Sequence, residues 1–391
     1  MRTTVAIVGG GYGGITVAKA LDEVTDVVLI EPRDTFVHNT AALRGLIDPQ
    51  WTEQRLFLPY DRLLSRGQVI QDRAVRVDTR SITLASGMRI AADYIVLATG
   101  STFPFPAKVD VDDSAAAKNK YRATHNALAN ADNVLLLGAG PVGLELAGEI
   151  KAAWADKAVT IVDPGRDIVA GDYPDEFRAE LRRQLDALGV RLILGTSLRE
   201  QPPSDAGEAK TFTATLHSGQ QLTVDIWFRC FGVAPVTGYL ADDLASARQE
   251  NGHLKVTADL RLAGQQNVFA IGDITAIPEA KQAGAAEQHA AVVASNIRTL
   301  LHGGDELTTY QPGPAGIVLP LGPKGGATYA PGWHGYLDAD AVSQIRQRSA
   351  ARPNSLLHLD ILDAEATSQF KGADLMTDVY AEIFGLHQRH R

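Results

Sequence analysis

The chain of 391 residues contains a single cysteine, Cys230. One thiol cannot form an intrachain disulfide, a redox-active CxxC pair or a cysteine-ligated metal cluster. Enzymes that pass electrons through a dithiol are therefore excluded, and we expect no metal site. Such sparing use of cysteine suits the reducing conditions of the cytoplasm, where we expect the protein to work.

Basic residues are in the minority. Lys and Arg number 37 against 46 Asp and Glu, which gives a net charge of −9. An excess of negative charge repels phosphate backbones, so the composition argues against a nucleic-acid partner.

Long apolar runs are missing as well. The chain starts with a strand-like stretch. It does not show the charged region, the apolar region and the cleavage site that together make a signal peptide. The longest weakly charged stretch, residues 310–334, carries Lys324 and is rich in Gly and Pro, so it cannot form an apolar helix of ~20 residues. We expect no transmembrane segment, while peripheral association with a membrane stays open. A final amphipathic helix over residues 375–384 has an acidic polar face, which suits core packing better than anionic lipid.

Two stretches about 130 residues apart read alike. Residues 5–14 and 134–143 each join an apolar run to the pattern G-x-G-x-x-G, and an Ala- and Leu-rich helical stretch follows. A second apolar run then ends on an acid, Glu31 or Asp163. Continuous apolar runs are typical of strands buried on both faces of a parallel sheet. The sequence therefore predicts an α/β protein that contains a duplicated nucleotide-binding unit.

The chemistry of these motifs fits dinucleotides. Glycines permit a tight turn and let the backbone approach a pyrophosphate, whose charge the helix N-terminus favours, and the acid accepts from ribose hydroxyls. Asp163 would repel a 2′-phosphate, which favours NADH over NADPH, although Arg166 nearby could soften that preference. As alternatives, a glycine pattern can be only a turn, and Asp163 can simply cap a strand.

Taken together, the motifs resemble the FAD- and NAD(P)-linked pyridine nucleotide oxidoreductases over essentially the whole chain. Three further segments fit that family: residues 93–101, a buried strand that ends in a turn, residues 225–232, which match it in the second unit, and the buried strand of residues 267–273. Finer motifs are similar to the ferroptosis-suppressor branch of the apoptosis-inducing-factor group and to type II NADH dehydrogenases. They are H-N-T-A-A-L-R at 38–44, G-L-E-L-A-G-E at 143–149, K-x-A-x-x-A-x-x-H at 281–289 and K-x-x-D-L at 371–375.

The resemblance implies two Rossmann-like domains and a small α+β C-terminal domain. Residues 1–105 and 253–308 would form an FAD-binding domain, split by an NAD(P)H-binding domain of residues 106–252. Residues 309–391 would form the C-terminal domain that shapes the acceptor site.

The resemblance also implies which residues bind the two cofactors, FAD and NADH, with NADPH as a possible substitute. Asp273 would bond the flavin ribityl chain, and its alternative role is a helix N-cap. The residues expected around FAD are Gly9, Gly11, Gly14, Glu31, Arg44, Val75, Thr99, Gly100, Asp273 and Lys281. Those expected around NADH are Gly138, Gly140, Gly143 and Asp163.

Six side chains are candidates for catalysis. Resemblance places Glu145 beside the nicotinamide, with Glu149 one helical turn away, and either could instead be a first-turn acid favoured by the helix dipole. His38 and His289 could relay protons to a reduced quinone, or be structural. Gln288 matches the second glutamine of the A-Q-x-x-x-Q quinone pattern of type II dehydrogenases, but the first falls on Gly284, which puts such a pocket in doubt. Lys371 could sit near the flavin pyrimidine edge, or on the surface.

The function that the resemblance implies is transfer of hydride from NADH to FAD and on to a quinone. Residues 41–44 read A-A-L-R where related disulfide reductases carry CxxC, so no dithiol would intervene. Two other functions stay open. One is reduction of a ferredoxin- or rubredoxin-type carrier, which is usually acidic and would need a basic patch that no run here suggests. The other is NADH sensing by a flavoprotein with slow turnover.

Overall fold

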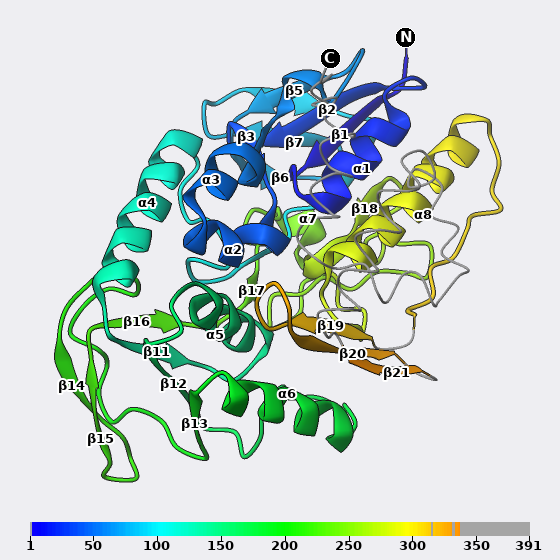
Figure 1. Ribbon diagram of the computed structural model, residues 1–391. Helices are drawn as coiled ribbons and strands as arrows, with labels where there is room; N and C mark the ends of the chain where they lie inside the picture. The colour runs from blue at the N-terminus through cyan, green and yellow to red at the C-terminus, as the bar shows by residue number, and fades with distance from the viewer. Residues whose placement is uncertain (1, 314–315, 331–332, 337–391) are drawn as a thin grey trace, which may run out of the picture.

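The computed structural model describes residues 2–313, 316–330 and 333–336, which form two nucleotide-binding units, each with its own parallel sheet (Figure 1). This architecture confirms the predicted α/β class with two Rossmann-like units. Lys371 and the predicted final helix lie outside the described residues. The predicted domain boundaries stay a prediction.

The sheet of the first unit has five parallel strands. Their order is β18 (Val268–Ala270), β9 (Tyr94–Leu97), β1 (Thr4–Val8), β2 (Asp26–Glu31) and β5 (Gln68–Gln71). The strand β18 returns from far along the chain and pairs with β9. The carboxyl ends of β2, β1, β9 and β18 therefore lie in a row along one edge, where ligands of open parallel sheets bind.

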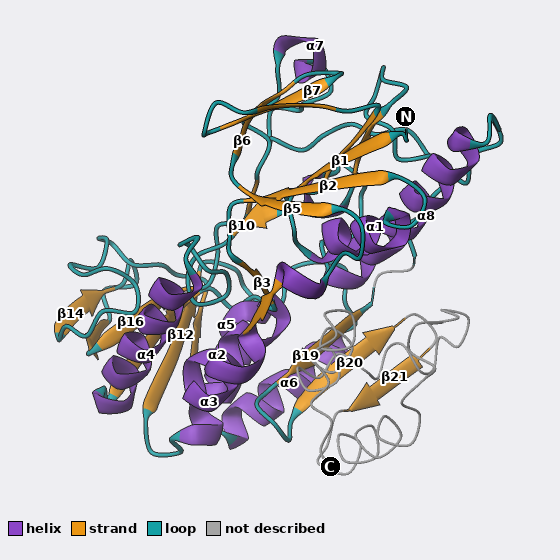
Figure 2. Ribbon diagram, turned by 90° about the horizontal axis from the view of Figure 1, so that it is seen from above, coloured by secondary structure: helices purple, strands orange, loops and turns teal. Residues whose placement is uncertain are grey.

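Two different layers cover this sheet. On one face lie the helices α1 (Tyr12–Leu21) and α8 (Ala283–Leu301), which pack side by side and bury Val5, Ile7 and Val96 of the sheet. On the other face an antiparallel meander buries the alternate residues Ala6, Val8 and Ile95. The meander consists of β6 (Ala74–Val77), β7 (Ser81–Leu84) and β8 (Arg89–Ala91). Figure 2 shows the two helices and the meander on opposite sides of the sheet.

The second unit repeats the plan with four parallel strands. Their order is β13 (Val190–Leu194), β12 (Ala158–Asp163), β11 (Asn133–Leu137) and β16 (Ile226–Arg229). One face packs against helices that include α4 (Ser114–Asn130), α5 (Pro141–Ala153) and α6 (Asp175–Ala187). The other face is covered by the hairpin β14 (Phe212–Thr215) and β15 (Gln221–Val224).

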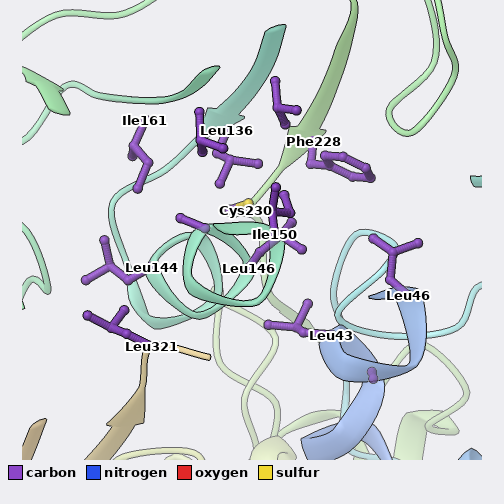
Figure 3. Close-up of a cluster of buried hydrophobic side chains, with 14 of the residues drawn as sticks. Leu43, Leu46, Leu136, Leu144, Leu146, Ile150, Ile161, Phe228, Cys230 and Leu321 are labelled. Atoms are coloured by element: carbon purple, nitrogen blue, oxygen red, sulfur yellow. The ribbon is translucent and has the colours of Figure 1, made fainter. Parts of the chain in front are cut away.

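The helical core of the second unit includes side chains from elsewhere in the chain. Leu43 and Leu46 come from α2 (Ala42–Ile47), which follows β2 and precedes β5 along the chain. A C-terminal sheet is formed by β19 (Ile317–Pro320), β20 (Gly326–Ala330) and β21 (Trp333–Tyr336). Leu319 lies in β19, and Leu321 follows this strand directly. Figure 3 shows Leu43, Leu46 and Leu321 gathered around α5.

Short elements connect these layers. The antiparallel pair β10 (Ser101–Thr102) and β17 (Ala234–Pro235) holds together the two places where the chain crosses between the units. The others are β3 (Thr35–Val37), η1 (Asn39–Ala41), α3 (Pro49–Trp51), η2 (Thr52–Leu56), β4 (Phe57–Pro59), η3 (Tyr60–Arg62), α7 (Asp242–Ala245) and η4 (Gly272–Ile274).

In the part of the chain that the structure describes, no helix is both long and apolar enough to cross a membrane. Among the same residues, no three His, Cys, Asp or Glu side chains are grouped as a metal site would need.

Candidate functional site

The first glycine loop joins β1 to α1. Gly9 has a positive φ of 107°, and a Cβ on Gly14 would lie 1.8 Å from the carbonyl oxygen of Gly9, so neither position accepts a side chain. A Cβ on Gly11 would instead meet no atom within 4 Å. No side chain caps the start of α1. The start of α1 therefore leaves room beside Gly11 for a diphosphate, whose charge a helix N-terminus favours.

The second glycine loop, between β11 and α5, has the same geometry. Gly138 has a φ of 117°, and a Cβ on Gly143 would lie 2.0 Å from the carbonyl oxygen of Gly138. A Cβ on Gly140 meets nothing within 4 Å, and α5 begins at Pro141 without a side-chain cap. Both loops thus fit a diphosphate for the same physical reasons.

An acid at the end of the neighbouring strand closes each loop. Glu31 accepts hydrogen bonds from the amides of Gly10 (2.6 Å) and Arg33 (3.1 Å). Asp163 accepts from the amides of Ala139 (2.7 Å) and Gly165 (2.6 Å). Each carboxylate is thus held beside the residue that follows the first glycine, where a nucleotide ribose would lie. Arg166, which could soften a preference for NADH, is exposed.

Asp273 lies in the turn η4, directly after β18. One of its oxygens accepts from Ser101 Oγ at 2.5 Å and lies 3.3 Å from Lys108 Nζ, which also donates to the Ser101 carbonyl at 2.8 Å. The alternative that Asp273 caps a helix is wrong, because the N-cap residues of η4 and α8 are Ile271 and Gln282.

Lys108 is a site residue that the sequence analysis missed. Burial lowers the pKa of its ammonium group, and the nearby Asp273 carboxylate opposes that effect. No motif marks this lysine, which follows the Pro-rich linker. It reaches the site only because the folded chain brings the linker next to Asp273, directly after β18.

Four other residues expected around FAD take different positions. Thr99 donates its hydroxyl to the Val236 carbonyl at 2.6 Å, and the Gly100 carbonyl accepts from the Val236 amide, so both join the chain crossings. Lys281 donates to the Ile277 carbonyl at 2.8 Å, and burial lowers the pKa of its ammonium group. Val75 is half exposed on β6. Their roles toward FAD stay predictions.

A charged cluster links the two units. Arg44, on α2, donates from both Nη2 (2.9 Å) and Nε (3.3 Å) to one oxygen of Glu149, on α5. Glu145 lies one turn earlier on α5, and its burial, together with the negative charge of Glu149, raises its pKa to about 8. Neither acid is in the first turn of α5, so the helix-dipole alternative is wrong. Glu145 is thus a carboxyl group that is largely protonated near neutral pH.

The two predicted relay histidines are fully buried. His38 Nδ1 lies 3.1 Å from Tyr12 Oη, and the ring of His38 packs with the rings of Tyr12 and Phe36, at centroid distances of 6.2 Å and 6.5 Å. His289 Nδ1 accepts from the amide of Gly272 at 3.0 Å. Gln288 is half-buried on α8. Proton relay by either histidine, and quinone binding by Gln288, stay predictions.

Cys230 is a buried core residue just after β16. Burial raises the pKa of its thiol to about 12, so it is a protonated and unreactive group at neutral pH. The geometry gives no route for a thiol relay among the described residues.

Comparison with known proteins places the chain among related sequences. Residues 3–290 match the pattern of the pyridine nucleotide-disulphide oxidoreductase family. Ferroptosis suppressor protein 1 of Xenopus tropicalis is 30% identical over 82% of this chain and 87% of that protein. Apoptosis-inducing factor homolog B of Dictyostelium discoideum is 29% identical over 84% of this chain and 89% of that protein.

Solved structures share the fold at lower sequence identity. The structure of NDH2 from Plasmodium falciparum in complex with NADH matches with a TM-score of 0.69 and 13% identity, covering 98% of both chains. The sulfide:quinone oxidoreductase from Aquifex aeolicus matches with a TM-score of 0.64 and 18% identity, covering 90% of this chain and 91% of that one.

Proposed function

Because the chain belongs to the pyridine nucleotide-disulphide oxidoreductase family, we propose that it is an NADH oxidoreductase that delivers electrons to a quinone-type acceptor without a redox disulfide. Its cofactors are those of the family, FAD and NAD(P)H. FAD supplies the redox chemistry, since it can take hydride from NADH and pass electrons on to an acceptor.

The residues of the chain supply binding and alignment. In this proposal the loop around Gly11 holds the FAD diphosphate, Glu31 a ribose of FAD, and Asp273 the ribityl chain. The loop around Gly140 and the carboxylate of Asp163 hold NADH in the same way. Support comes from the matching geometry of the two loops. In each loop, an acidic side chain accepts a hydrogen bond from the amide that follows the first glycine.

Glu145 would lie beside the nicotinamide, at the end of the second unit that faces the first. Its ion-paired neighbour Glu149 binds α2 of the first unit through Arg44. This contact would keep the two nucleotide sites in a fixed relation, and alignment of donor and acceptor is a large part of hydride-transfer catalysis.

The observation that carries the proposal is the combination of two nucleotide loops with no dithiol. Residues 41–44 hold no cysteine, and the one thiol, Cys230, is buried and protonated. Electrons must then leave FAD directly for the acceptor. The quinone class rests on the resemblance of residues 38–44 and 281–289 to the ferroptosis-suppressor branch, and Gln288 is the residue we expect near it.

Anaerobic rapid mixing tests the proposal. The protein is first reduced with one equivalent of NADH and then mixed with coenzyme Q1, with a reducible ferredoxin, or with aerated buffer. We expect fastest reoxidation by the quinone. Fastest reoxidation by ferredoxin would instead identify a carrier reductase, and a reduced complex that persists with all three would identify a sensor.

A further inference from the structure

A buried polar chain lies behind the turn that carries Asp273. Glu279, in the loop before α8, accepts the hydroxyl hydrogen of Tyr310 on Oε2 at 2.5 Å. Its Oε1 faces His289 Nε2 at 2.8 Å, although the alignment is not that of an ideal hydrogen bond. The side chains of His289 and Glu279 are only 1% and 8% exposed. The rings of His289 and Tyr310 pack edge to face with centroids 4.2 Å apart.

The contacts of His289 define its proton. Because Nδ1 accepts the N–H of Gly272 at 3.0 Å, Nδ1 must carry a lone pair, and the ring proton must be on Nε2, toward Glu279. The charged groups around the ring are Glu279, Asp273 and Lys281. Burial lowers the pKa of His289, with a further contribution from Lys281, while the two carboxylates oppose the shift. The imidazole is therefore neutral at pH 7 and held in one tautomer.

The bond to Gly272 fixes the turn η4 on one side. Gly272 has a φ of 71°, and its carbonyl accepts from both the amide and the hydroxyl of Thr275 at 3.0 Å. His289 holds the amide of the same residue. Asp273 is the next residue, so these bonds determine where its carboxylate lies.

We propose that Glu279 and Tyr310 hold His289 in its Nε2–H tautomer, and that His289 is thereby a positioning residue for the flavin-side carboxylate of Asp273. The inference rests on the proposed binding of FAD at this edge of the sheet. It gives His289 a role other than proton relay, because Nδ1 accepts from the Gly272 amide and Nε2 faces Glu279 inside the protein. Glu279 and Tyr310 enter the site only through this chain of contacts.

Two substitutions of His289 separate the two bonds that its ring makes. His289→Asn keeps a carbonyl oxygen near the position of Nδ1 and can still accept from Gly272, but cannot reach Glu279. His289→Gln reaches toward Glu279 and leaves the Gly272 amide unpaired. A buried amide without a partner costs about 1–3 kcal/mol, so we expect about 5- to 100-fold weaker FAD binding in His289→Gln and a smaller loss in His289→Asn.

FAD binding is measured on the holoenzyme, by the flavin fluorescence released over a dilution series, without NADH or acceptor. If His289 serves only to fill space, the smaller Asn must be at least as harmful as Gln, and that order would overturn the proposal. If instead wild-type protein does not retain FAD, the proposed function itself fails, so the two failures are distinguishable.

A spectroscopic measurement reports the tautomer directly. In protein labelled with ¹⁵N-histidine, we expect His289 to show a protonated Nε2 and an unprotonated Nδ1 at pH 7. Glu279→Gln replaces one acceptor oxygen by a donor, and should shift part of the population to the Nδ1–H form and weaken FAD binding. Glu306→Gln makes the same change at an exposed position and should alter neither. A wild-type His289 that is Nδ1–H or doubly protonated would refute the inference.

Discussion

The ionisation of Glu145 gives the sharpest test of the reductive step. Burial and Glu149 move the pKa of Glu145 from 4.5 to about 8, so that roughly ten molecules are protonated for each ionised one at pH 7. Oxidation of NADH leaves a positive charge on the nicotinamide, which an adjacent carboxylate stabilises and a neutral acid does not. If Glu145 lies beside that ring, reduction by NADH should become faster as the pH rises through about 8.

Three substitutions should change the pH dependence of flavin reduction in different ways. Glu145→Gln should remove the transition and keep the slower rate. Glu149→Gln removes the like charge one turn away, worth at most ~3 kcal/mol, or about 2 pKa units, at a separation of ~6 Å and an effective dielectric constant of ~20. Since Arg44 already offsets part of that charge, we expect the midpoint to fall by about one unit. Arg44→Met should raise the midpoint instead.

The assay is anaerobic stopped-flow reduction of the bound flavin at saturating NADH, over neutral to alkaline pH. Reoxidation by coenzyme Q1, measured in the same buffers, is the control, because that step does not use the nicotinamide pocket in the same way. A transition that persists in Glu145→Gln, or a midpoint that moves the same way in Glu149→Gln and Arg44→Met, would refute the assignment.

Stability provides a second measurement on the same group. The folded protein keeps Glu145 protonated at pH values where the unfolded chain ionises it, so stability falls as the pH rises from about 4.5 to about 8. A shift of more than three units corresponds to at most ~5 kcal/mol, and this value is reduced because Glu145 is half-buried rather than fully buried. Glu145→Gln should therefore raise the melting temperature more at pH 8 than at pH 5.

Other predictions concern the second nucleotide site and the thiol. Asp163→Ala should improve kcat/KM for NADPH relative to NADH by about 10- to 100-fold, since a 2′-phosphate no longer meets a carboxylate; steady-state kinetics with both substrates check this. Gly143→Ala places a methyl group 2.0 Å from the Gly138 carbonyl and should abolish tight NADH binding while FAD stays bound, as equilibrium titration would show. Cys230→Ser should leave quinone reduction nearly unchanged and lower the melting temperature, because a buried, protonated thiol only packs.

Local patterns in the sequence predicted those parts of the site whose geometry is determined by residues adjacent in the chain. The two glycine loops, Glu31 and Asp163 fall within strand–turn–helix segments, where a few adjacent residues determine the geometry. The fold class followed from the same segments, because apolar runs of this kind form parallel sheets. The segment over residues 93–101, predicted as a strand that ends in a turn, contains the strand β9, which ends at Leu97, and Gly100 has a positive φ of 63° in the turn that follows.

Contacts between distant segments could not be predicted in this way. Lys108 meets Asp273 across 165 residues, and Arg44 meets Glu149 across 105 residues. Glu279 and Tyr310 have no motif that marks them, since their roles depend on the position of His289 in the folded chain. The sequence offered a structural role for His289 only as an alternative to proton relay, and gave no partner for it.

The packing of α2 has a consequence for protein engineering. Residues 106–252 look like a cassette that could be exchanged between relatives to change nucleotide preference. Their core, however, is completed by Leu43 and Leu46 from one side and Leu321 from the other (Figure 3). A graft of the cassette alone would leave these leucines against a foreign surface, with a cavity or a clash at each. The transferable module is therefore discontinuous, and a chimera should carry the α2 segment and the β19–β20 hairpin together with the second sheet.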